Sequence, residues 1–375
     1  MAKYIVETYY TCTFKVKHYL DDISNNQLDQ LDKRDDGDFE ILDVKKVVWK
    51  KRSFSNNLSR FYGKKLPDKS FKEKHCGNGP FISIVVKQDN PIYEERKTSK
   101  GKALVNSLLY DKKQLYREWT GGGHKIHTSN DMMEADHDIF FLFNKKSSDY
   151  LNNDSWDNQI KEYQTNIRGF DGWENLDDMF SFVNESSEYV VLRNYEEIDA
   201  MDENKSDIDF LTIDIDFSYH INGIKKHKNK FRSAYSVKID SKYYSADIRC
   251  LGDGYYDIKW IKDIVKNRIL YKNRFFIPCP EDEFFSLLYH SLIHKNKMSD
   301  KYLKKLISLI EKNNLNHDVD LLKTRGGSFE LLARYMKSKG YKIIRPIDYS
   351  VQFNYKNKGV KRWIWEFIGH FRNAK

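Results

Sequence analysis

Two aspartates separated by a single residue, Asp207 and Asp209, lie in an apolar stretch that is typical of a β-strand. Alternate residues of a strand share one face, so the two carboxylates should project together, with about 7 Å between their Cα atoms. Asp247 lies between Ala246 and Ile248 in a later strand-like segment and could add a third carboxylate to that face. Adjacent carboxylates repel each other unless a cation lies between them, and Mg²⁺ prefers oxygen ligands. The sequence therefore predicts that these three aspartates are catalytic residues that bind Mg²⁺ or Mn²⁺.

A second aspartate pair, Asp214 and Asp216, repeats the same spacing. Such a pair could be the metal motif of a glycosyltransferase that uses a nucleotide sugar. If one strand ran unbroken from residue 207 to residue 216, the two pairs would lie on opposite faces, so one of them would have to be non-catalytic. We favour the first pair and expect the second pair in the turn that ends the strand.

The segment 175–295 resembles the polymerase-beta-like nucleotidyltransferase superfamily. It has VVLRNYEEI at 190–198, SDIDFL at 206–211, and DIR at 247–249 in a later strand. The local sequence is most similar to divergent stand-alone families of the superfamily. These families are in turn similar to phospho-sugar transferases that act on surface glycans. The resemblance implies a mixed sheet with flanking helices and a metal site made by the three aspartates. It also implies transfer of a nucleotidyl or phospho-sugar group to a hydroxyl acceptor such as a carbohydrate.

The sequence departs from the superfamily at the phosphate-binding loop, where Gly-Ser or Gly-Gly normally stands. Residues 192–195 read Leu-Arg-Asn-Tyr, and Arg193 could replace the backbone cradle with a charge-assisted contact to phosphate. A basic run at 225–232 is either a charged surface loop or a further contact to the phosphates. The residues expected to bind the phosphates are Arg193, Asn194, Ser206, Lys225, Lys226 and Lys228.

A triple glycine opens the segment GGGHKIH at 121–127. Glycine lets the backbone come close to a ligand, and the histidines together with acidic residues at 134–138 could bind a metal or a phosphate. The alternative is a flexible turn before an acidic helix start. A functional segment would give the protein a second site, made of Gly122, Gly123, His124, Lys125 and His127, and would make it bifunctional.

Two features of the C-terminal half also allow two interpretations. His290 and His294 are spaced four residues apart and could be two zinc ligands on a helix, but their aromatic neighbours favour a packed helix that covers the central sheet. The predicted helix at 361–372 has apolar and aromatic residues on one face and basic residues beside it. It either docks on the core of the protein or lies on a membrane surface.

The composition limits the class of protein. The chain has 375 residues and a formal net charge of +9, a balance that suits phosphate-bearing partners, although the 64 Lys and Arg are interspersed with 55 Asp and Glu. Nucleic acid is therefore a less favoured partner than a nucleotide. Four dispersed cysteines argue against a disulfide framework or a cysteine-rich zinc module. The N-terminus has no apolar signal region, and no apolar run reaches the ~18–20 residues of a membrane span. We expect a cytoplasmic protein, with peripheral membrane contact through the last helix as an alternative.

The elements that must position these residues point to an α+β fold. We expect a β-rich domain at 1–145, a linker at 146–173, a nucleotidyltransferase-like catalytic domain at 174–295 and a helical region at 296–375. Alternation and apolar runs predict strands at 81–86, 137–144, 189–194, 206–216 and, as a hairpin, 234–251. Helical periodicity predicts helices at 103–110, 175–186, 259–270, 281–295, 300–313, 328–340 and 361–372.

These observations favour an Mg²⁺-dependent transferase that takes a nucleoside triphosphate or a nucleotide sugar as donor. A metal-dependent glycosyltransferase that uses Asp214 and Asp216 is the second enzyme hypothesis. A nucleic-acid-binding or polysaccharide-binding protein with a basic, aromatic surface is the non-enzymatic alternative.

Overall fold

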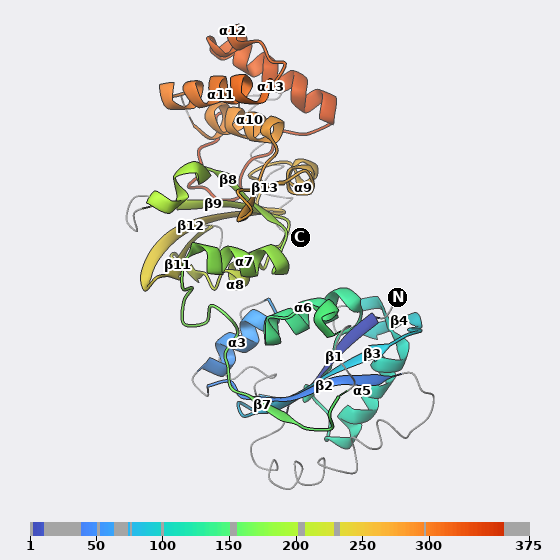
Figure 1. Cartoon of the computed structure of the whole chain (residues 1–375). Coiled ribbons are helices and arrows are strands. Elements are labelled where there is room, and N and C mark those ends of the chain that lie inside the picture. The colour runs from blue at the N-terminus through green and yellow to red at the C-terminus, as the bar shows by residue number, and fades with distance from the viewer. Residues whose placement is uncertain are drawn as a thin grey trace. The chain divides into compact units, whose positions relative to one another are not determined.

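The computed structural model describes residues 39–50, 53–63, 74–75, 77–98, 101–150, 156–201, 207–228, 233–295 and 298–355, and the backbone of residues 3–10. The predicted helix at 361–372 and the candidate residue Ser206 lie outside this part of the chain. The fold is α+β, as expected, with helices and mixed sheets. The chain forms two compact units (Figure 1). The first comprises Met1–Ser187, Asp216–Ile224 and Val237–Tyr243, and the second Glu188–Ile215, Lys225–Ser236 and Tyr244–Lys375.

The first unit is built on a five-stranded sheet in the order β6-β1-β3-β2-β7. Strand β3, predicted from the apolar run at 81–86, is almost fully buried and lies at the centre, where it pairs antiparallel with β1 and β2. The short strand β7 pairs in parallel with β2. The strands are β1 (Lys3–Tyr10), β2 (Glu40–Val47), β3 (Phe81–Gln88), β6 (Ile126–Thr128) and β7 (Lys161–Tyr163).

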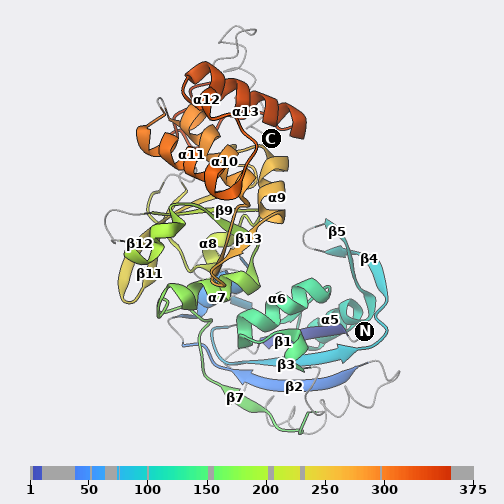
Figure 2. The ribbon, with the colours of Figure 1, turned by 45° about the horizontal axis from the view of Figure 1, so that its top comes forward.

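Helices and a hairpin complete the first unit. Figure 2 shows β4 and β5 as a separate two-stranded arm that extends beyond the five-stranded sheet. The predicted helix at 175–186 is confirmed, and Asn175 caps it by accepting a hydrogen bond from the Asp178 N–H. The elements are α3 (Phe54–Phe61), β4 (Tyr93–Thr98), β5 (Gly101–Asn106), α5 (Ser107–Trp119), α6 (Met132–Phe143), η3 (Ser147–Tyr150), α7 (Leu176–Ser186) and α8 (Phe217–His220).

Two sequence predictions for the first unit are wrong. The segment 137–144, predicted as a strand, belongs to helix α6, because Asp131 caps the helix start and Asn144 ends it in the left-handed conformation. A short apolar run does not distinguish a buried strand from a buried helix, and the cap residue was the missed signal. The segment 103–110, predicted as a helix, begins as strand β5 and becomes helical only at Ser107.

The segment 146–173, expected to be a linker, is part of the first unit. It contains β7, and the indole N–H of Trp173 donates to the Ile221 carbonyl oxygen at 2.8 Å. The first unit also includes α7. The chain passes into the second unit after Ser187, and not within the segment 146–173. Polar composition suggested a linker, but Trp173 and Ile167 are both buried.

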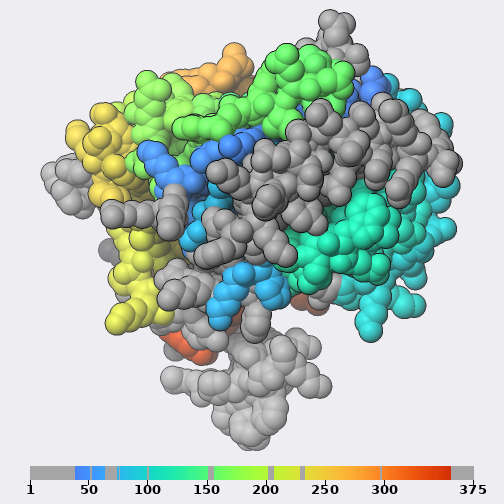
Figure 3. All heavy atoms as spheres, turned by 90° about the horizontal axis from the view of Figure 1, so that it is seen from below, coloured from blue at the N-terminus to red at the C-terminus, as the bar shows by residue number. Residues whose placement is uncertain are grey.

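The second sheet has the order β10-β11-β12-β9-β8. Strand β8 pairs antiparallel with β9, whereas β12 pairs in parallel with β9, so the sheet is mixed. Strands β11 and β12 form the predicted hairpin, which turns at Asp240 and Ser241 with φ of 47° and 62°, the left-handed pair that a two-residue hairpin turn requires. This yellow segment reaches the surface in Figure 3. The strands are β8 (Tyr189–Arg193), β9 (Asp207–Thr212), β10 (Ile224–Lys225), β11 (Ala234–Ile239) and β12 (Lys242–Cys250).

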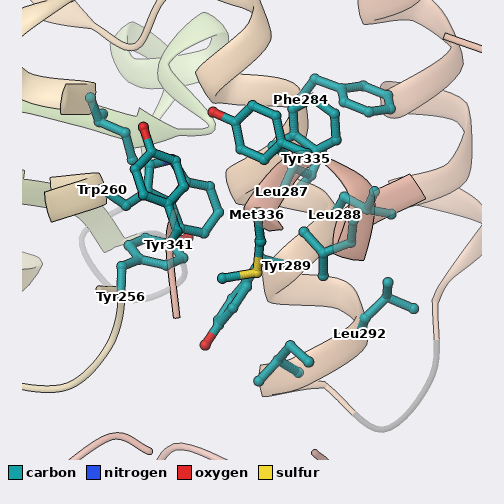
Figure 4. Close-up of a cluster of buried hydrophobic side chains, with 14 of the residues drawn as sticks. Tyr256, Trp260, Phe284, Leu287, Leu288, Tyr289, Leu292, Tyr335, Met336 and Tyr341 are labelled. Carbon is teal, nitrogen blue, oxygen red and sulfur yellow. The ribbon is translucent and has the colours of Figure 1, made fainter. Parts of the chain in front are cut away.

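Helices pack with one another around an aromatic cluster in the second unit (Figure 4). The rings of Trp260 and Tyr341 stack with 5.4 Å between their centroids, and those of Phe285 and Tyr335 with 3.6 Å. No helix in the described part of the chain is long and apolar enough to cross a membrane. The elements are η4 (Tyr195–Ala200), α9 (Ile258–Lys266), β13 (Ile269–Tyr271), β14 (Phe275–Ile277), α10 (Pro280–Tyr289), the π-helical turn η5 (His290–His294), α11 (Asp300–Asn313), α12 (Val319–Leu322) and α13 (Arg325–Lys339).

A buried arginine, Arg60 on α3, joins distant segments of the first unit. Its side chain is 1% exposed, and its guanidinium donates to four backbone carbonyl oxygens at 2.7–3.3 Å, from Ile167, Arg168, Tyr219 and His220. Burial lowers the pKa of Arg60 to about 9. Among the described residues no carboxylate pairs with it, so the charge is stabilised by the carbonyl dipoles and by the rings of Trp173 and Phe182, whose centroids each lie 5.9 Å from the guanidinium carbon.

We expect the substitution Arg60→Met to lower the free energy of unfolding by at least about 3 kcal/mol, because it leaves several buried carbonyls without a donor. Urea unfolding followed by circular dichroism measures this change. The matched control is Arg96→Met. Among the described residues the Arg96 side chain pairs at the surface with Glu94 and Asp111, so this substitution should change stability by less than about 1 kcal/mol. Equal unfolding midpoints for the two variants would contradict the role of Arg60.

Candidate functional site

The parallel pairing of β9 and β12 brings the three predicted aspartates together on one face of the second sheet. Asp247 lies directly opposite Asp209, and Ser245 lies opposite Asp207. Residues opposite each other in a ladder point to the same side, as do alternate residues of one strand. The residues between them, Ile208 and Ala246, are buried. Asp207, Asp209 and Asp247 therefore share one face, as the sequence predicted.

Arg193, predicted to bind phosphate, is instead paired with Asp209. It ends β8 opposite Asp209, after an irregularity in the ladder. Its Nε and Nη2 donate to the two oxygens of Asp209 at 3.2 and 3.0 Å, an arrangement in which the guanidinium and the carboxylate face each other edge to edge. Burial on its own lowers the pKa of Arg193, but the charge of Asp209, its hydrogen bonds and the neighbouring tyrosines together more than offset this, and the pKa lies well above its ordinary value.

A second arginine, Arg249, pairs with Asp247 but contacts only one of its two oxygens. Its Nε and Nη2 donate to Oδ2 of Asp247 at 3.1 and 2.8 Å, while the Ser233 hydroxyl donates to Oδ1 at 2.8 Å. Arg249 also forms an ion pair with Asp348 at 3.3 Å. Burial would raise the pKa of Asp348, but hydrogen bonds from Ser350 and the charge of Arg249 lower it. The sequence analysis did not identify Arg249 or Asp348 as part of this site.

Tyr255 lies between the two arginines. Its hydroxyl oxygen accepts from both terminal nitrogens of Arg193 at 3.3 Å, and the guanidinium of Arg249 lies over its ring, 4.6 Å from the centroid. Since both of these Arg193 nitrogens donate to Tyr255, the Tyr255 proton is directed to Nδ1 of His290 at 2.8 Å. The proton of His290 is then on Nε2, which faces the Tyr302 hydroxyl at 3.4 Å. Burial, followed by the charge of Arg193, lowers the pKa of His290, so the ring is neutral.

His294 lies one π-helical turn beyond His290. It is 2% exposed, its ring centroid is 4.1 Å from that of Tyr255, and neither of its ring nitrogens has a hydrogen-bond partner among the described residues. Burial and the nearby arginines lower its pKa to about 2. The two histidines pack against aromatic rings, as expected. The π-helical turn itself was not predicted, and such turns are frequent at functional sites.

Asp207 is the exposed member of the aspartate set, and within the described part of the chain its side chain makes no hydrogen bond or ion pair. Next to it, the Lys226 ammonium donates to the Ser245 hydroxyl, which lies opposite Asp207 in the ladder. The basic run thus places Lys226 beside the aspartate face. Lys225 lies over the ring of Tyr235, at 6.0 Å, and Lys228 is exposed.

Asn194, predicted to bind phosphate, directly follows strand β8. It is exposed and has φ of 57° and ψ of 20°, a left-handed conformation that glycine and asparagine adopt most readily.

The second aspartate pair lies outside the strand, as expected. Strand β9 ends at Thr212, Asp214 follows it, and Asp216 directly precedes α8. Asp253 is half-buried, and desolvation raises its pKa to about 6, but its oxygens accept backbone N–H groups of the turn before α9. Asp257 caps α9. Asp253 and Asp257 therefore have local structural roles.

The possible second site in the first unit is held together by packing contacts. A Cβ on Gly123 would lie 2.8 Å from Nδ1 of His75, and the ring of His124 stacks on that of His75. Gly121, Gly122 and Gly123 all have positive φ, as a turn requires. The Lys125 ammonium donates to the Thr120 carbonyl, and Nε2 of His127 lies 3.0 Å from the buried Asp138 carboxylate. These contacts order the turn, and a ligand there stays a prediction.

The donor set on the second sheet suits a divalent cation. Two arginines face three carboxylates, Asp209, Asp247 and Asp348, so one negative charge remains before Asp207 is counted. Oxygen donors from two neighbouring strands are the ligands that Mg²⁺ and Mn²⁺ prefer. In the described residues no three acidic, histidine or cysteine side chains already converge on one point as metal ligands. Both oxygens of Asp209 and Oδ2 of Asp247 accept from guanidinium groups, and Oδ1 of Asp247 accepts from the Ser233 hydroxyl.

Comparisons of this chain with protein-family models, with curated proteins and with solved structures give no match. The function is therefore argued from the geometry and chemistry of the site.

The low pKa of His294 has a consequence for stability. In the unfolded chain His294 takes up a proton near pH 6.5, whereas in the folded protein it stays neutral. The contribution of His294 to the free energy of unfolding is therefore complete above pH 6.5 and is lost as the pH falls below that value. We expect His294→Leu to be as stable as the wild type at pH 7.5, because no hydrogen bond is removed. At pH 5 the variant should be more stable by roughly 2 kcal/mol.

Urea unfolding at the two pH values measures both effects. The control is His290→Leu, which removes the hydrogen bonds to Tyr255 and Tyr302 and should destabilise the protein at pH 7.5. A His294→Leu variant that is less stable than the wild type at both pH values would contradict this interpretation.

Proposed function

We propose that the second unit carries an Mg²⁺-dependent transferase site of the nucleotidyltransferase type. It would transfer a nucleotidyl or phospho-sugar group to a hydroxyl acceptor, with a nucleoside triphosphate or a nucleotide sugar as donor. The observation that carries the proposal is the parallel register that sets Asp247 opposite Asp209, with Asp207 on the same face. The exposure of Asp207 and the remaining negative charge at the site support it.

Each side chain would have a defined role. Asp207, Asp209 and Asp247 would bind the metal, which when bound neutralises the phosphates and lowers the pKa of the acceptor hydroxyl. Arg193 and Lys226 would contact phosphate oxygens, since both lie beside the aspartate face. Asp247 would take the acceptor's proton at Oδ1, because both hydrogen bonds from Arg249 go to Oδ2 and Oδ1 accepts only from the neutral Ser233 hydroxyl among the described residues.

A carbohydrate acceptor follows only from the resemblance to phospho-sugar transferases, as does a role in surface-glycan synthesis. The alternatives are a glycosyltransferase that uses Asp214 and Asp216, and a binding protein without catalytic activity. Unlike the proposal, neither alternative needs Asp207 and Asp209 as metal ligands.

A thermal-shift panel tests the proposal. Nucleoside triphosphates and nucleotide sugars are each added with and without Mg²⁺ or Mn²⁺. For the wild type we expect one donor class to raise the melting temperature by roughly 5 °C at a hundredfold excess over its dissociation constant, and only with metal. The Asp207→Asn, Asp209→Asn double variant should lose this shift.

The control is the double variant Asp214→Asn, Asp216→Asn, which should keep the shift. If this control loses the shift and the Asp207, Asp209 variant keeps it, the glycosyltransferase alternative is correct. No metal-dependent shift with any donor would contradict an enzymatic role for the site.

A further inference from the structure

Arg193 has two kinds of partner, and only one of them is charged. Its guanidinium donates to both oxygens of Asp209 and, through the other edge, to the hydroxyl of Tyr255. The side chain is 10% exposed. Among the described residues Asp209 is the only acid in an ion pair with Arg193.

Arg249 differs from Arg193 in this respect. It pairs with Asp247 on one side and with Asp348, which is 4% exposed, on the other. If Asp247 turned to another cation, Arg249 would keep a carboxylate. If Asp209 did so, Arg193 would keep only the neutral hydroxyl of Tyr255, which is itself oriented by His290.

We infer that Arg193 is an internal counter-ion that prevents Asp209 from binding a metal ion until a polyphosphate provides the guanidinium with a new partner. The inference rests on the proposed function and concerns the regulation of that site. A metal ion alone would have to leave a buried guanidinium without an opposite charge, which is strongly unfavourable. A polyphosphate removes this obstacle, because its oxygens accept the two parallel N–H bonds that Asp209 accepts in the free protein.

The arrangement favours a metal ion that binds together with a polyphosphate over a metal ion that binds alone. The metal ion and the polyphosphate enter together. The metal ion replaces Arg193 as the partner of Asp209, and the polyphosphate replaces Asp209 as the partner of Arg193. Tyr255, which is 2% exposed, retains its contact with Arg193 while Asp209 changes partner. The guanidinium therefore stays beside the aspartate face and does not have to be brought there by the ligand.

Two binding measurements on the full chain test the inference. Mn²⁺ binding without any anion is measured by electron paramagnetic resonance. Binding of inorganic tripolyphosphate saturated with Mg²⁺ is measured by titration calorimetry. We expect Arg193→Gln to bind Mn²⁺ alone about tenfold more tightly than the wild type does, or more, and to bind the Mg²⁺–tripolyphosphate complex about tenfold more weakly. Opposite effects of one substitution distinguish a counter-ion from a residue that only supports the fold.

Three variants complete the design. Arg249→Gln is the matched control and should change Mn²⁺ affinity less than threefold, roughly, because Arg249 has a second acid in Asp348. Adding Asp209→Asn to Arg193→Gln should abolish the gain in Mn²⁺ affinity. Arg193→Lys, which retains the charge without the planar fork, should lie between the wild type and Arg193→Gln in both measurements and replaces the latter if that variant does not fold.

The results distinguish failure of the counter-ion inference from failure of the proposed function. If the wild type binds Mn²⁺ alone as tightly as Arg193→Gln does, the counter-ion inference is wrong and the proposed function is untouched. If neither protein binds Mn²⁺ or the Mg²⁺–tripolyphosphate complex, the proposed function is wrong and the inference fails with it.

Discussion

The site depends on the register between two parallel strands, β9 and β12. Asp247 lies opposite Asp209, and a slip of one residue would move Asp247 to the other face of the sheet. Buried apolar residues fix that register, because Ile208, Phe210, Ala246 and Ile248 fill the opposite face of the same two strands. Burial of one face thus determines which polar side chains meet on the other. The irregularity in the ladder between β8 and β9 adds Arg193 to the aspartates.

The second constraint is electrostatic. Charged side chains taken out of water need opposite charges or hydrogen bonds, and here Arg193 and Arg249 provide them for the carboxylates. Tyr255 contacts both guanidinium groups, and the neutral His290 orients its hydroxyl. The free protein therefore contains a partly neutralised site in which a divalent cation and an anion could each replace an existing partner.

Much of this arrangement could be predicted from local sequence. Alternation within strands placed Asp207 and Asp209 on one face, and the cap at Asn175 marked a helix start. The pairing of Arg249 with Asp348 could not be predicted, because Asp348 is 99 residues away and lies outside any regular element. The run at 137–144 was misread as a strand, since its helical character depends on the cap at Asp131. Residues brought together by tertiary packing leave no signal in local spacing.

The most direct test of the central claim is to locate the metal. Anomalous diffraction from crystals grown with Mn²⁺ and inorganic tripolyphosphate would show its position. We expect one or two Mn²⁺ peaks within coordination distance of Asp207, Asp209 and Asp247, with Arg193 turned from Asp209 to a phosphate oxygen. Mn²⁺ and tripolyphosphate bound elsewhere, with the ion pair between Arg193 and Asp209 intact, would contradict the assignment of this sheet face as the active site.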